Sequence, residues 1–466
     1  MSEIPQAVIR QLQQFDQQHV LTWWAELSSQ QQADLLQQLN SLDLQTLTSV
    51  WQTSRGAEVS DTANKAAHRI AQAKSPQNVI RQPQTTADEL QRQQAAELGE
   101  AALGAGRVAV ITVAGGQGSR LGFDLPKGMF PIGPITDRTL FQIFAEQILA
   151  RQRRHSAGLP WLLMTSSATH ADTVRFFEQQ NYFGLDRADV HFFQQGSLPA
   201  MDLQTGRLLM ADRAHLCLSP DGHGGLVTAL ESSGLMQAMS DRGVDHFFYH
   251  QVDNPTAILC DPVLIGLHLQ AESELTTNVV RKLAPTERMG VLVDVGGHLE
   301  IIEYSELNET QAAATDDSGQ WIFWAGNTAI HVFCRKFLER IAAGSGQLAL
   351  HVANKKVPCL DENGQPFEPE TPNAAKFERF IFDALPLAAN ALIVEGNRGR
   401  EFNPVKNADG NDSPATCRAA LKRIAQQWLQ SAGCNPDLAQ SMEISPLQAL
   451  DEQEFATGIR TGRIRL

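Results

Sequence analysis

Residues 108–131 read VAVITVAGGQGSRLGFDLPKGMFP, and this stretch decides the fold. Its first six residues are mostly apolar and β-branched, which is typical of a buried strand. A glycine-rich turn follows at once, and Arg120 and Lys127 come within a dozen residues of it. Glycines leave backbone N–H groups uncovered, and both cations suit phosphate oxygens. The stretch therefore predicts a strand and a loop that closes on a polyphosphate, with a tight turn carrying two solvated cations as the alternative.

Two familiar phosphate-binding loops do not fit this stretch. In the P-loop, Ser or Thr follows the lysine directly, whereas Gly128 follows Lys127 here. In the dinucleotide fingerprint, the third glycine comes three residues after the second, where this chain has Leu121. No acidic residue ends an obvious second strand about 20 residues later, where a ribose-binding carboxylate would stand. The loop therefore favours a nucleoside triphosphate over a nicotinamide cofactor.

The totals exclude several classes of protein. The chain has 466 residues, 42% of them hydrophobic and 19% charged, which is ordinary for a soluble globular protein of more than one domain. Its net charge of −14 argues against a nucleic-acid partner. No apolar run approaches the roughly 20 residues of a membrane span, and the N-terminus lacks a basic-then-apolar signal, so no membrane partner is expected.

The cysteines and histidines show no disulfide or metal pattern. Six cysteines are scattered without a CxxC pair, which predicts reduced thiols in a cytoplasmic protein. The 13 histidines show no close ligand spacing, so a structural zinc is not expected.

Three regions differ in composition. Residues 1–100 are glutamine-rich, nearly free of glycine and apolar at helical spacing, which predicts an N-terminal helical region. Residues 101–415 alternate short apolar runs with amphipathic stretches, which predicts an α/β domain around a mostly parallel sheet. Residues 416–466 predict a small C-terminal lobe with one helix and strand-like pieces at 442–444 and 457–466.

The central region yields specific expectations for its elements. The expected strands are 108–113, 160–165, 189–193, 246–252, 277–282, 290–294, 300–304 and 391–395. The expected helices are 139–153, 168–179, 226–242, 334–343 and 374–388, with another near 416–431 in the C-terminal lobe.

Asp253 follows an apolar strand in the segment HFFYHQVDN, residues 246–254. In open α/β sheets the carboxyl ends of the strands face the ligand crevice. A carboxylate there suits Mg²⁺ that is shared with phosphate oxygens. The equal alternative is a turn-forming Asp-Asn pair before Pro255.

Two further loops could contact a nucleotide. The segment SPDGHGG, residues 219–225, is glycine-rich and precedes an expected helix, so its backbone could approach a base or phosphate closely; alone it is equally a plain loop. The segment FFQQGSLPAM, residues 192–201, carries Gln195, whose amide offers one donor and one acceptor to a pyrimidine edge. A lone glutamine is usually solvated.

Four more polar residues complete the candidate set. Glu303 in EYSE and Asn327 in GNTAIHVF could bind sugar hydroxyls. In PVKNAD, Lys406 is one more cation for a phosphate and Asp409 one more carboxylate for a metal. Each of these taken alone is more often a plain surface or turn residue.

The order of these motifs resembles that of the eukaryotic-type UDP-sugar pyrophosphorylase family, most closely the UDP-N-acetylglucosamine (UDP-N-acetylhexosamine) pyrophosphorylases. The resemblance covers residues 105–420, with weaker similarity on either side. The segments that carry it are AGGQGSRLGFDLPKGM, FFEQQNYFGL, FFQQGSLPAM, PDGHGG, VDN, PTERMGV, EYSE, GNTAIHVF, HVANKKVP, KFERFIFD and PVKNAD.

The resemblance implies a fold and residue roles. The implied core is a doubly wound nucleotidyltransferase domain of the Rossmann-like, GT-A-like kind. The implied nucleotide contacts are Gly115 and Gly116 at the uracil and ribose, Gln195 and Gly222 at the uracil, His223 beside them, and Arg120 and Lys127 at the triphosphate. The implied sugar contacts are Gly290, Glu303 and Asn327, with Lys406 at the sugar phosphate and Asp253 at the metal.

The implied reaction joins UTP and N-acetylglucosamine 1-phosphate to give UDP-N-acetylglucosamine and pyrophosphate. The implied cofactor is Mg²⁺, with Mn²⁺ as a second candidate, and the only expected partners are the two substrates. We expect a monomer or weak dimer. The alternatives are a UTP–glucose-1-phosphate or broad UDP-sugar pyrophosphorylase, and a non-catalytic nucleotide sensor that has kept the fold.

One residue departs from the family pattern. His223 stands where the family usually has Asn in its second glycine loop. Imidazole still donates or accepts a hydrogen bond, but it is bulkier and can titrate. The departure leaves the nucleobase contact and the sugar preference open.

Overall fold

A computed structural model describes residues 4–56, 67–344 and 348–466. The chain forms two compact units that interleave along the sequence. The first contains Met1–Ala71, Gln195–Gly225 and Leu348–Asp383, and the second contains Gln72–Gln194, Leu226–Gln347 and Ala384–Leu466.

The first unit packs three helices with small antiparallel sheets. Its helices are α1 (Gln6–Gln14), α2 (Ser29–Asn40) and α3 (Leu44–Gly56). One sheet has the order β14 (His351–Lys355), β17 (Ala374–Glu378), β7 (Met201–Asp202). The two hairpins are β6 (Ser197–Pro199) with β8 (Leu218–Pro220) and β15 (Cys359–Leu360) with β16 (Pro366–Phe367). Helix and sheet residues share one apolar core that includes Leu35, Met201 and Phe377.

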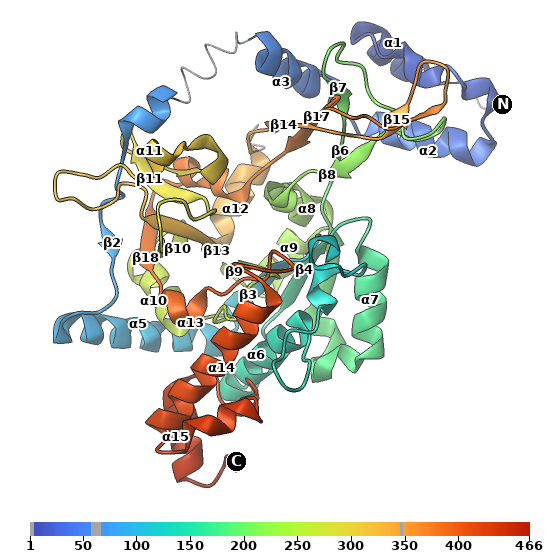
Figure 1. The fold of residues 1–466 in the computed structure, drawn as a ribbon. Coiled ribbons are helices and arrows are strands. Elements are labelled where there is room, and N and C mark those ends of the chain that lie inside the picture. The colour runs from blue at the N-terminus through green and yellow to red at the C-terminus, as the bar shows by residue number, and fades with distance from the viewer. Residues whose placement is uncertain (1–3, 57–66, 345–347) are drawn as a thin grey trace. The chain divides into compact units, whose positions relative to one another are not determined.

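The second unit is a mixed α/β fold around a large, mostly parallel sheet (Figure 1). The strands of its main path, in spatial order, are β2 (Val79–Ile80), β18 (Ala391–Glu395), β10 (Leu275–Arg281), β13 (Ala325–Cys334), β9 (His246–Gln251), β3 (Val108–Val113), β4 (Trp161–Thr165) and β5 (Val190–Gln194). Neighbours on this path are parallel except at β13, which is antiparallel to both β10 and β9. Off the path, β11 (Val291–Val295) pairs antiparallel with β1 (Ala73–Lys74), β12 (His298–Ile302) and β13.

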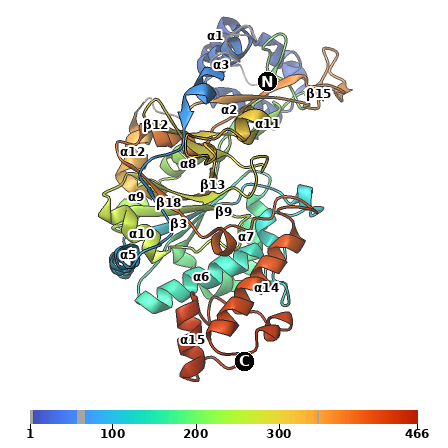
Figure 2. The same ribbon diagram turned by 60° about the vertical axis from the view of Figure 1, so that its left-hand side comes forward.

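Helices cover this sheet. They are α5 (Thr86–Gly104), α6 (Leu140–His155), α7 (His170–Gln179), α8 (Leu226–Ser232), α9 (Leu235–Asp241), α10 (Pro262–Gln270), α12 (Arg335–Ala343) and α14 (Pro414–Ser431). Figures 1 and 2 show α10 lying along α5, and the two helices pack closely. The short helices α11 (Glu309–Ala312) and α13 (Arg398–Glu401) lie in connections, and α15 (Glu452–Arg460) lies near the C-terminus.

Most expected elements are confirmed, with shifts of one or two residues at their ends. The expected helix 226–242 is divided into α8 and α9 by a turn in which Gly234 has φ +73°. The expected helix 374–388 is wrong. Residues 374–378 form strand β17, which pairs with β14 and β7, and a 3₁₀ segment (Ile381–Leu387) follows. The sequence did not predict strand β13 or helix α10, nor several short strands and helices of the central region.

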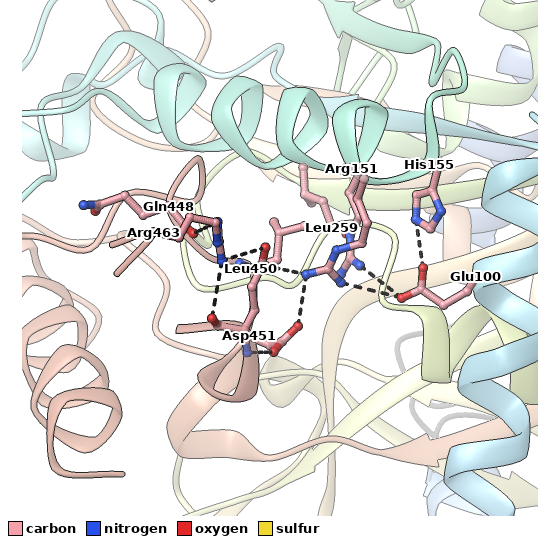
Figure 3. A network of polar contacts seen from close by, with 10 residues as sticks. Glu100, Arg151, His155, Leu259, Gln448, Leu450, Asp451 and Arg463 are labelled. Atoms are coloured by element: carbon pink, nitrogen blue, oxygen red, sulfur yellow. Dashed lines mark hydrogen bonds and ion pairs between the residues drawn. The ribbon is translucent and has the colours of Figure 1, made fainter. Parts of the chain in front are cut away.

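The strand-like pieces expected at 442–444 and 457–466 are also wrong. Residues 442–444 have no regular structure, and α15 covers the start of the second piece. A polar network attaches this end of the chain to α6, because Arg154 on α6 pairs with Asp451 and Glu454. On the same helix, Arg151 and His155 both form ion pairs with Glu100 on α5 (Figure 3).

Within the part of the chain that the structure describes, no helix combines the length and apolar character that a bilayer crossing requires.

Candidate functional site

The candidate phosphate loop and Asp253 leave two adjacent strands at the same edge of the sheet. Strands β3 and β9 are parallel neighbours with Val113 opposite Gln251, and the backbone N–H of Val252 donates to the carbonyl of Val113 at 3.0 Å. Because parallel strands end at one edge, the segments that follow Val113 and Gln251 start side by side. The structure thus brings together the two motifs that the sequence placed at strand ends.

The loop folds back so that Lys127 lies beside the first glycines. The N–H of Lys127 donates to the carbonyl of Gly116 at 3.1 Å, and the N–H of Gly118 donates to the carbonyl of Leu125 at 2.9 Å. Ser166, which follows β4, donates its hydroxyl to the carbonyl of Gly115 at 2.8 Å. The carbonyls are thereby used internally, and Gly116 remains exposed at the surface.

Arg120 lies in a single 3₁₀ turn, Ser119–Leu121, that ends at Gly122 in a left-handed conformation with φ +67°. Its side chain is exposed, and Lys127 is half-buried. Neither has a carboxylate partner in the described ranges, so both charges are available to an anion. This availability is what phosphate binding requires.

Lys406 is held next to Asp253 by the backbone. The N–H of Val405 donates to the carbonyl of Asp253 at 2.8 Å, and the N–H of Lys406 donates to the carbonyl of Asp412 at 2.7 Å. The ammonium of Lys406 lies 5.4 Å from the centroid of the Phe402 ring. The structure thus joins the end of β9 to the PVKNAD segment.

Asp412 is a carboxylate of this cluster that sequence reasoning missed. Burial raises its pKa, while Lys406 acts in the opposite sense and Asp253 adds to the increase. Asp409, the sequence candidate for a second metal ligand, is exposed and makes no hydrogen bond or ion pair among the described residues. No local pattern distinguishes the two, because both belong to the same polar turn.

The donor set near Asp253 fits a divalent ion that is shared with a substrate. Among residues 4–56, 67–344 and 348–466 there is no cluster of three His, Cys, Asp or Glu side chains suited to hold a metal. Asp253 supplies a half-buried carboxylate, and a hard ion such as Mg²⁺ commonly takes one or two carboxylates with phosphate oxygens and water. The residues therefore fit a shared site and not a closed protein cage.

The three candidate sugar-binding residues lie close together although 37 positions separate the first from the last. The N–H of Asn327 donates to the carbonyl of Gly290 at 2.9 Å. A methyl group on Gly290 would lie 2.9 Å from Oε1 of Glu303. Strands β11, β12 and β13 meet here, with Val291 opposite both Ile302 and Gly326.

A β-bulge directly follows Asn327. The register between β10 and β13 shifts after Asn278, so that Thr328 and Ala329 have no partner residue. Ala329 adopts φ +55°, and its N–H donates to Oδ1 of Asn327 at 2.9 Å. Since β13 runs antiparallel, its first residues lie at the edge where β9 and β10 end. Bulges of this kind commonly re-aim a side chain at a functional site.

The remaining three candidates, Gln195, Gly222 and His223, belong to the first unit. Gly222 has φ +84° and lies against the backbone of Arg379, where a side chain would overlap the carbonyl. The N–H of Gly224 donates to that carbonyl at 2.8 Å. Residues 221–225 are therefore packed onto residues 379–381.

His223 is committed to internal contacts. Its Nδ1 accepts a hydrogen bond from the N–H of Ile381 at 3.1 Å, and its ring lies 5.5 and 5.6 Å from those of Phe380 and Phe382. Burial lowers the pKa of His223 to about 4, so the ring is neutral at neutral pH. It supplies the acceptor that an asparagine amide would also supply, and it does not titrate in the neutral range.

Asp221, in the same loop as His223, is a second residue that sequence reasoning missed, after Asp412. It is 4% exposed, its Oδ1 has no hydrogen-bond partner, and Oδ2 lies 4.0 Å from Nη1 of Arg379. Burial raises its pKa to about 6, and the charge of Arg379 opposes that increase. The loop thus holds a buried carboxylate that is only weakly paired, at an energetic cost.

Comparison with known proteins adds to this geometry. Residues 57–457 match the family described as UTP–glucose-1-phosphate uridylyltransferase. The chain is 36% identical over 436 residues to UDP-N-acetylhexosamine pyrophosphorylase-like protein 1 of Xenopus tropicalis, covering 91% of this chain and 84% of that protein. It is 39% identical over 346 residues to the UDP-N-acetylglucosamine pyrophosphorylase of Saccharomyces cerevisiae, covering 72% of each.

A solved structure is similar across nearly the whole chain. The uridine diphosphate N-acetylglucosamine pyrophosphorylase of Trypanosoma brucei superposes with a TM-score of 0.81 at 27% identity. The match covers 99% of this chain and 96% of that one.

Proposed function

Because this chain belongs to the UTP–glucose-1-phosphate uridylyltransferase family, we propose that it joins UTP and N-acetylglucosamine 1-phosphate to give UDP-N-acetylglucosamine and pyrophosphate. It is a nucleotidyltransferase. The observation that carries the proposal is the meeting of the cationic loop, Asp253 and Lys406 at one edge of the sheet. The fold is then of the doubly wound, GT-A-like nucleotidyltransferase kind, with a C-terminal lobe from residue 416.

The proposed roles are those that the family resemblance implies, and the chemistry of each residue fits them. Arg120 and Lys127 bind the triphosphate, with Gly115 and Gly116 offering backbone groups to the uridine. Gln195 and the backbone at Gly222 contribute to uracil recognition, and His223 supports that loop through its hydrogen bond to Ile381. Gly290, Glu303 and Asn327 bind the sugar, and Lys406 binds its phosphate.

The reaction is an in-line displacement at phosphorus. A phosphate oxygen of the sugar 1-phosphate forms a bond to the α-phosphorus of UTP, and the bond from that phosphorus to the bridging oxygen breaks, releasing pyrophosphate. The attacking phosphate is already ionised at neutral pH, so no general base is required. The work of the protein is to align two anions and offset their repulsion.

Each cation serves one part of this task. Lys406 holds the attacking phosphate beside Asp253, and Arg120 and Lys127 stabilise the charge that develops on the leaving pyrophosphate. Asp253 would hold Mg²⁺, whose positive charge would offset the negative charge of the phosphates. Asp412 moderates the charge of Lys406 from the other side.

The remaining traits are proposals of the same kind. We infer a cytoplasmic location, which six cysteines without disulfide partners support. We also infer a monomer or weak dimer, whose only partners are the two substrates.

A panel of sugar 1-phosphates tests the function. The protein is incubated with UTP, Mg²⁺ and one sugar 1-phosphate at a time, and pyrophosphate is measured. We expect release with N-acetylglucosamine 1-phosphate and little with glucose 1-phosphate. Equal or faster release with glucose 1-phosphate would assign the chain to the glucose branch. Calorimetric binding of UTP without turnover on any sugar phosphate would identify a non-catalytic nucleotide sensor.

A further inference from the structure

Glu401 has no role in the reaction described above, yet it is hydrogen-bonded to residues that adjoin both parts of the second unit's site. Its Oε1 accepts from the N–H of Asn397 at 2.7 Å, and its Oε2 accepts from Nδ2 of Asn278 at 3.1 Å. Its backbone carbonyl accepts from Nδ2 of Asn254 at 2.7 Å. Asn254 directly follows Asp253, so the segments after β9 and β18 and the middle of β10 converge on one residue of α13.

One arm of this network leads to the sugar-binding group. Asn278 lies on β10 at the bulge, where the hydroxyl of Thr328 donates to its carbonyl at 2.8 Å and lies 3.2 Å from its Oδ1. Thr328 directly follows Asn327. The carboxylate of Glu401 therefore supports the side chain that fixes the bulge carrying Asn327.

The other arm leads to the phosphate-binding group. Oδ1 of Asn254 accepts from the N–H of Asn403 at 3.1 Å, and the carbonyl of Asp253 accepts from the N–H of Val405 at 2.8 Å. These two hydrogen bonds hold the segment that precedes Lys406 against the end of β9. Glu401 thus contacts the anchors of Asn327 and of Lys406 at once.

The neighbouring backbone leaves the space in which this network forms. Gly396 is buried just after β18, and a methyl group there would lie 2.7 Å from both Nδ2 of Asn278 and Oε2 of Glu401. That distance is shorter than van der Waals contact allows. A residue larger than glycine would therefore push the amide and the carboxylate apart.

We propose that Glu401 is a positioning residue that sets the separation between the sugar-binding and the phosphate-binding side chains. This inference rests on the proposed function, because a sugar 1-phosphate is the substrate that spans both groups. Glu401 touches no substrate itself. Its loss should weaken use of the sugar 1-phosphate and leave UTP binding unchanged, since the triphosphate cations lie on the loop after β3.

The substitution Glu401→Gln tests the network with almost no change of shape. An amide offers one acceptor oxygen to two N–H donors, so one donor is left unpaired. We expect kcat/KM for N-acetylglucosamine 1-phosphate to fall about 10-fold, mainly through KM, which is the size expected for one unpaired buried donor. The Kd of UTP, measured by calorimetry without a sugar phosphate, should stay within about 2-fold.

A second substitution restores the hydrogen bonds. In Asn278→Asp/Glu401→Gln, the new amide donates to the new carboxylate, accepts from Asn397, and leaves the Thr328 acceptor in place. We expect this double variant to recover kcat/KM for the sugar phosphate to within about 3-fold of the wild type, whereas Asn278→Asp alone should be at least as impaired as Glu401→Gln. Recovery of KM is a result that general destabilisation does not produce.

Glu146→Gln provides a matched control. Glu146 is 6% exposed and accepts from Arg138, Gln142 and Ser445 at 3.0, 2.9 and 2.7 Å, but it lies outside the network. This variant should lose thermal stability without a change in KM. If Glu401→Gln folds too poorly to assay, Gly396→Ala displaces the same pair without altering a polar group and should raise KM in the same way.

The outcomes separate the inference from the function. An active wild type, with Glu401→Gln and Gly396→Ala showing unchanged KM and kcat per folded molecule, would overturn the role of Glu401 alone. So would a double variant no better than its single parents. A wild type that releases no pyrophosphate with any sugar 1-phosphate would overturn the proposed function and this inference with it.

Discussion

A methyl group added to Gly116 in the first glycine-rich loop would meet no atom within 4 Å, whereas one added to Gly225 in the second would overlap both carboxylate oxygens of Asp221. In sequence the two loops look alike. In the first, the absent side chain of Gly116 leaves its backbone open to a ligand, although Gly118 of the same loop packs against Phe123. In the second, absent side chains let the chain pack onto Arg379 and around a buried carboxylate.

The contrast separates two uses of glycine that composition cannot distinguish. An open glycine serves binding, so its replacement should change affinity and spare stability. A packed glycine serves folding, so its replacement should change stability first. The cations of the first loop and the carboxylate of the second extend the same distinction to charged side chains.

The strongest test of the contrast is Lys127→Ala. Its ammonium has no carboxylate partner in the described part of the chain, so little folding energy depends on it. By analogy with other electrostatic stabilisers of a transition state, kcat should fall about 10²- to 10³-fold. Pyrophosphate release and the thermal midpoint are measured on the same preparation, with the exposed Lys336→Ala on α12 as the control. A Lys127→Ala variant that stays active but unfolds more easily would assign Lys127 to folding and not to substrate binding.

Gly225→Ala should show the opposite behaviour. Its methyl group would press on the buried carboxylate of Asp221, and overpacking of this kind costs about 1–3 kcal/mol. Urea denaturation should show that loss in the free energy of unfolding. The double variant Asp221→Ala/Gly225→Ala removes the obstructing group and should be more stable than Gly225→Ala alone. A double variant that is no more stable than Gly225→Ala would show that the overlap with Asp221 is relieved in another way.

Asp221→Asn tests the buried charge through pH. Because the folded-state pKa, about 6, lies above the ordinary 3.8, the folded protein holds the proton more tightly. The stability contributed by the protonated group is complete below about pH 4 and is lost as the pH rises through about 6. An asparagine cannot ionise, so the variant should be about 3 kcal/mol more stable than the wild type at pH 7 and close to it near pH 4.

His223 contributes to stability over the same pH range, but with the opposite dependence on pH. Its pKa is lowered to about 4, so its contribution is present above about pH 6.5 and is lost as the pH falls through 4. The contribution of His223 is the same in the wild type and in Asp221→Asn, so it cancels from the difference between their free energies of unfolding. Urea midpoints at about pH 4, 5, 6 and 7 suffice, and a difference that does not vary with pH would contradict the assignment.

The smallest expected effect is that of Gly116→Ala. The backbone at Gly116 does not require a left-handed conformation and the space around it is open, so the thermal midpoint should stay within about 1 °C. Its exposed position beside Lys127 predicts a weaker fit of UTP, worth about 1 kcal/mol, or a several-fold rise in KM. Equal KM for UTP would remove Gly116 from the binding surface.

Local sequence was sufficient where a strand and the turn after it lie together. The apolar runs before Gly115 and Asp253 predicted β3, β9 and the polar residues at their ends, and the structure places these ends side by side. The proposed sugar-binding group could not be assembled in this way. Gly290, Glu303 and Asn327 meet through pairing of β11, β12 and β13; local chemistry offered Glu303 and Asn327 as separate candidates, and only the family resemblance added Gly290 and grouped the three.

Errors arose where long-range pairing overrode local preference. Residues 374–378 are AAKFE, a helix-favouring sequence, but they are strand β17 because β14 and β7 flank them. Asp412 was missed for a related reason. Which carboxylate of the turn after Lys406 faces that lysine depends on the path of the backbone, which local sequence does not encode.

The reversed direction of β13 carries a consequence for divergence among relatives. The first residues of β13 lie at the edge where β9 and β10 end, in an antiparallel arrangement with β11 and β12. The glycine-rich loop with Arg120 and Lys127 instead follows β3, which is parallel to both of its neighbours. Insertions or deletions in β11, β12 or β13 would displace Gly290, Glu303 and Asn327 while the loop after β3 stays in place. Under the proposed function, sugar preference can therefore change among relatives without a change in the shared catalytic step.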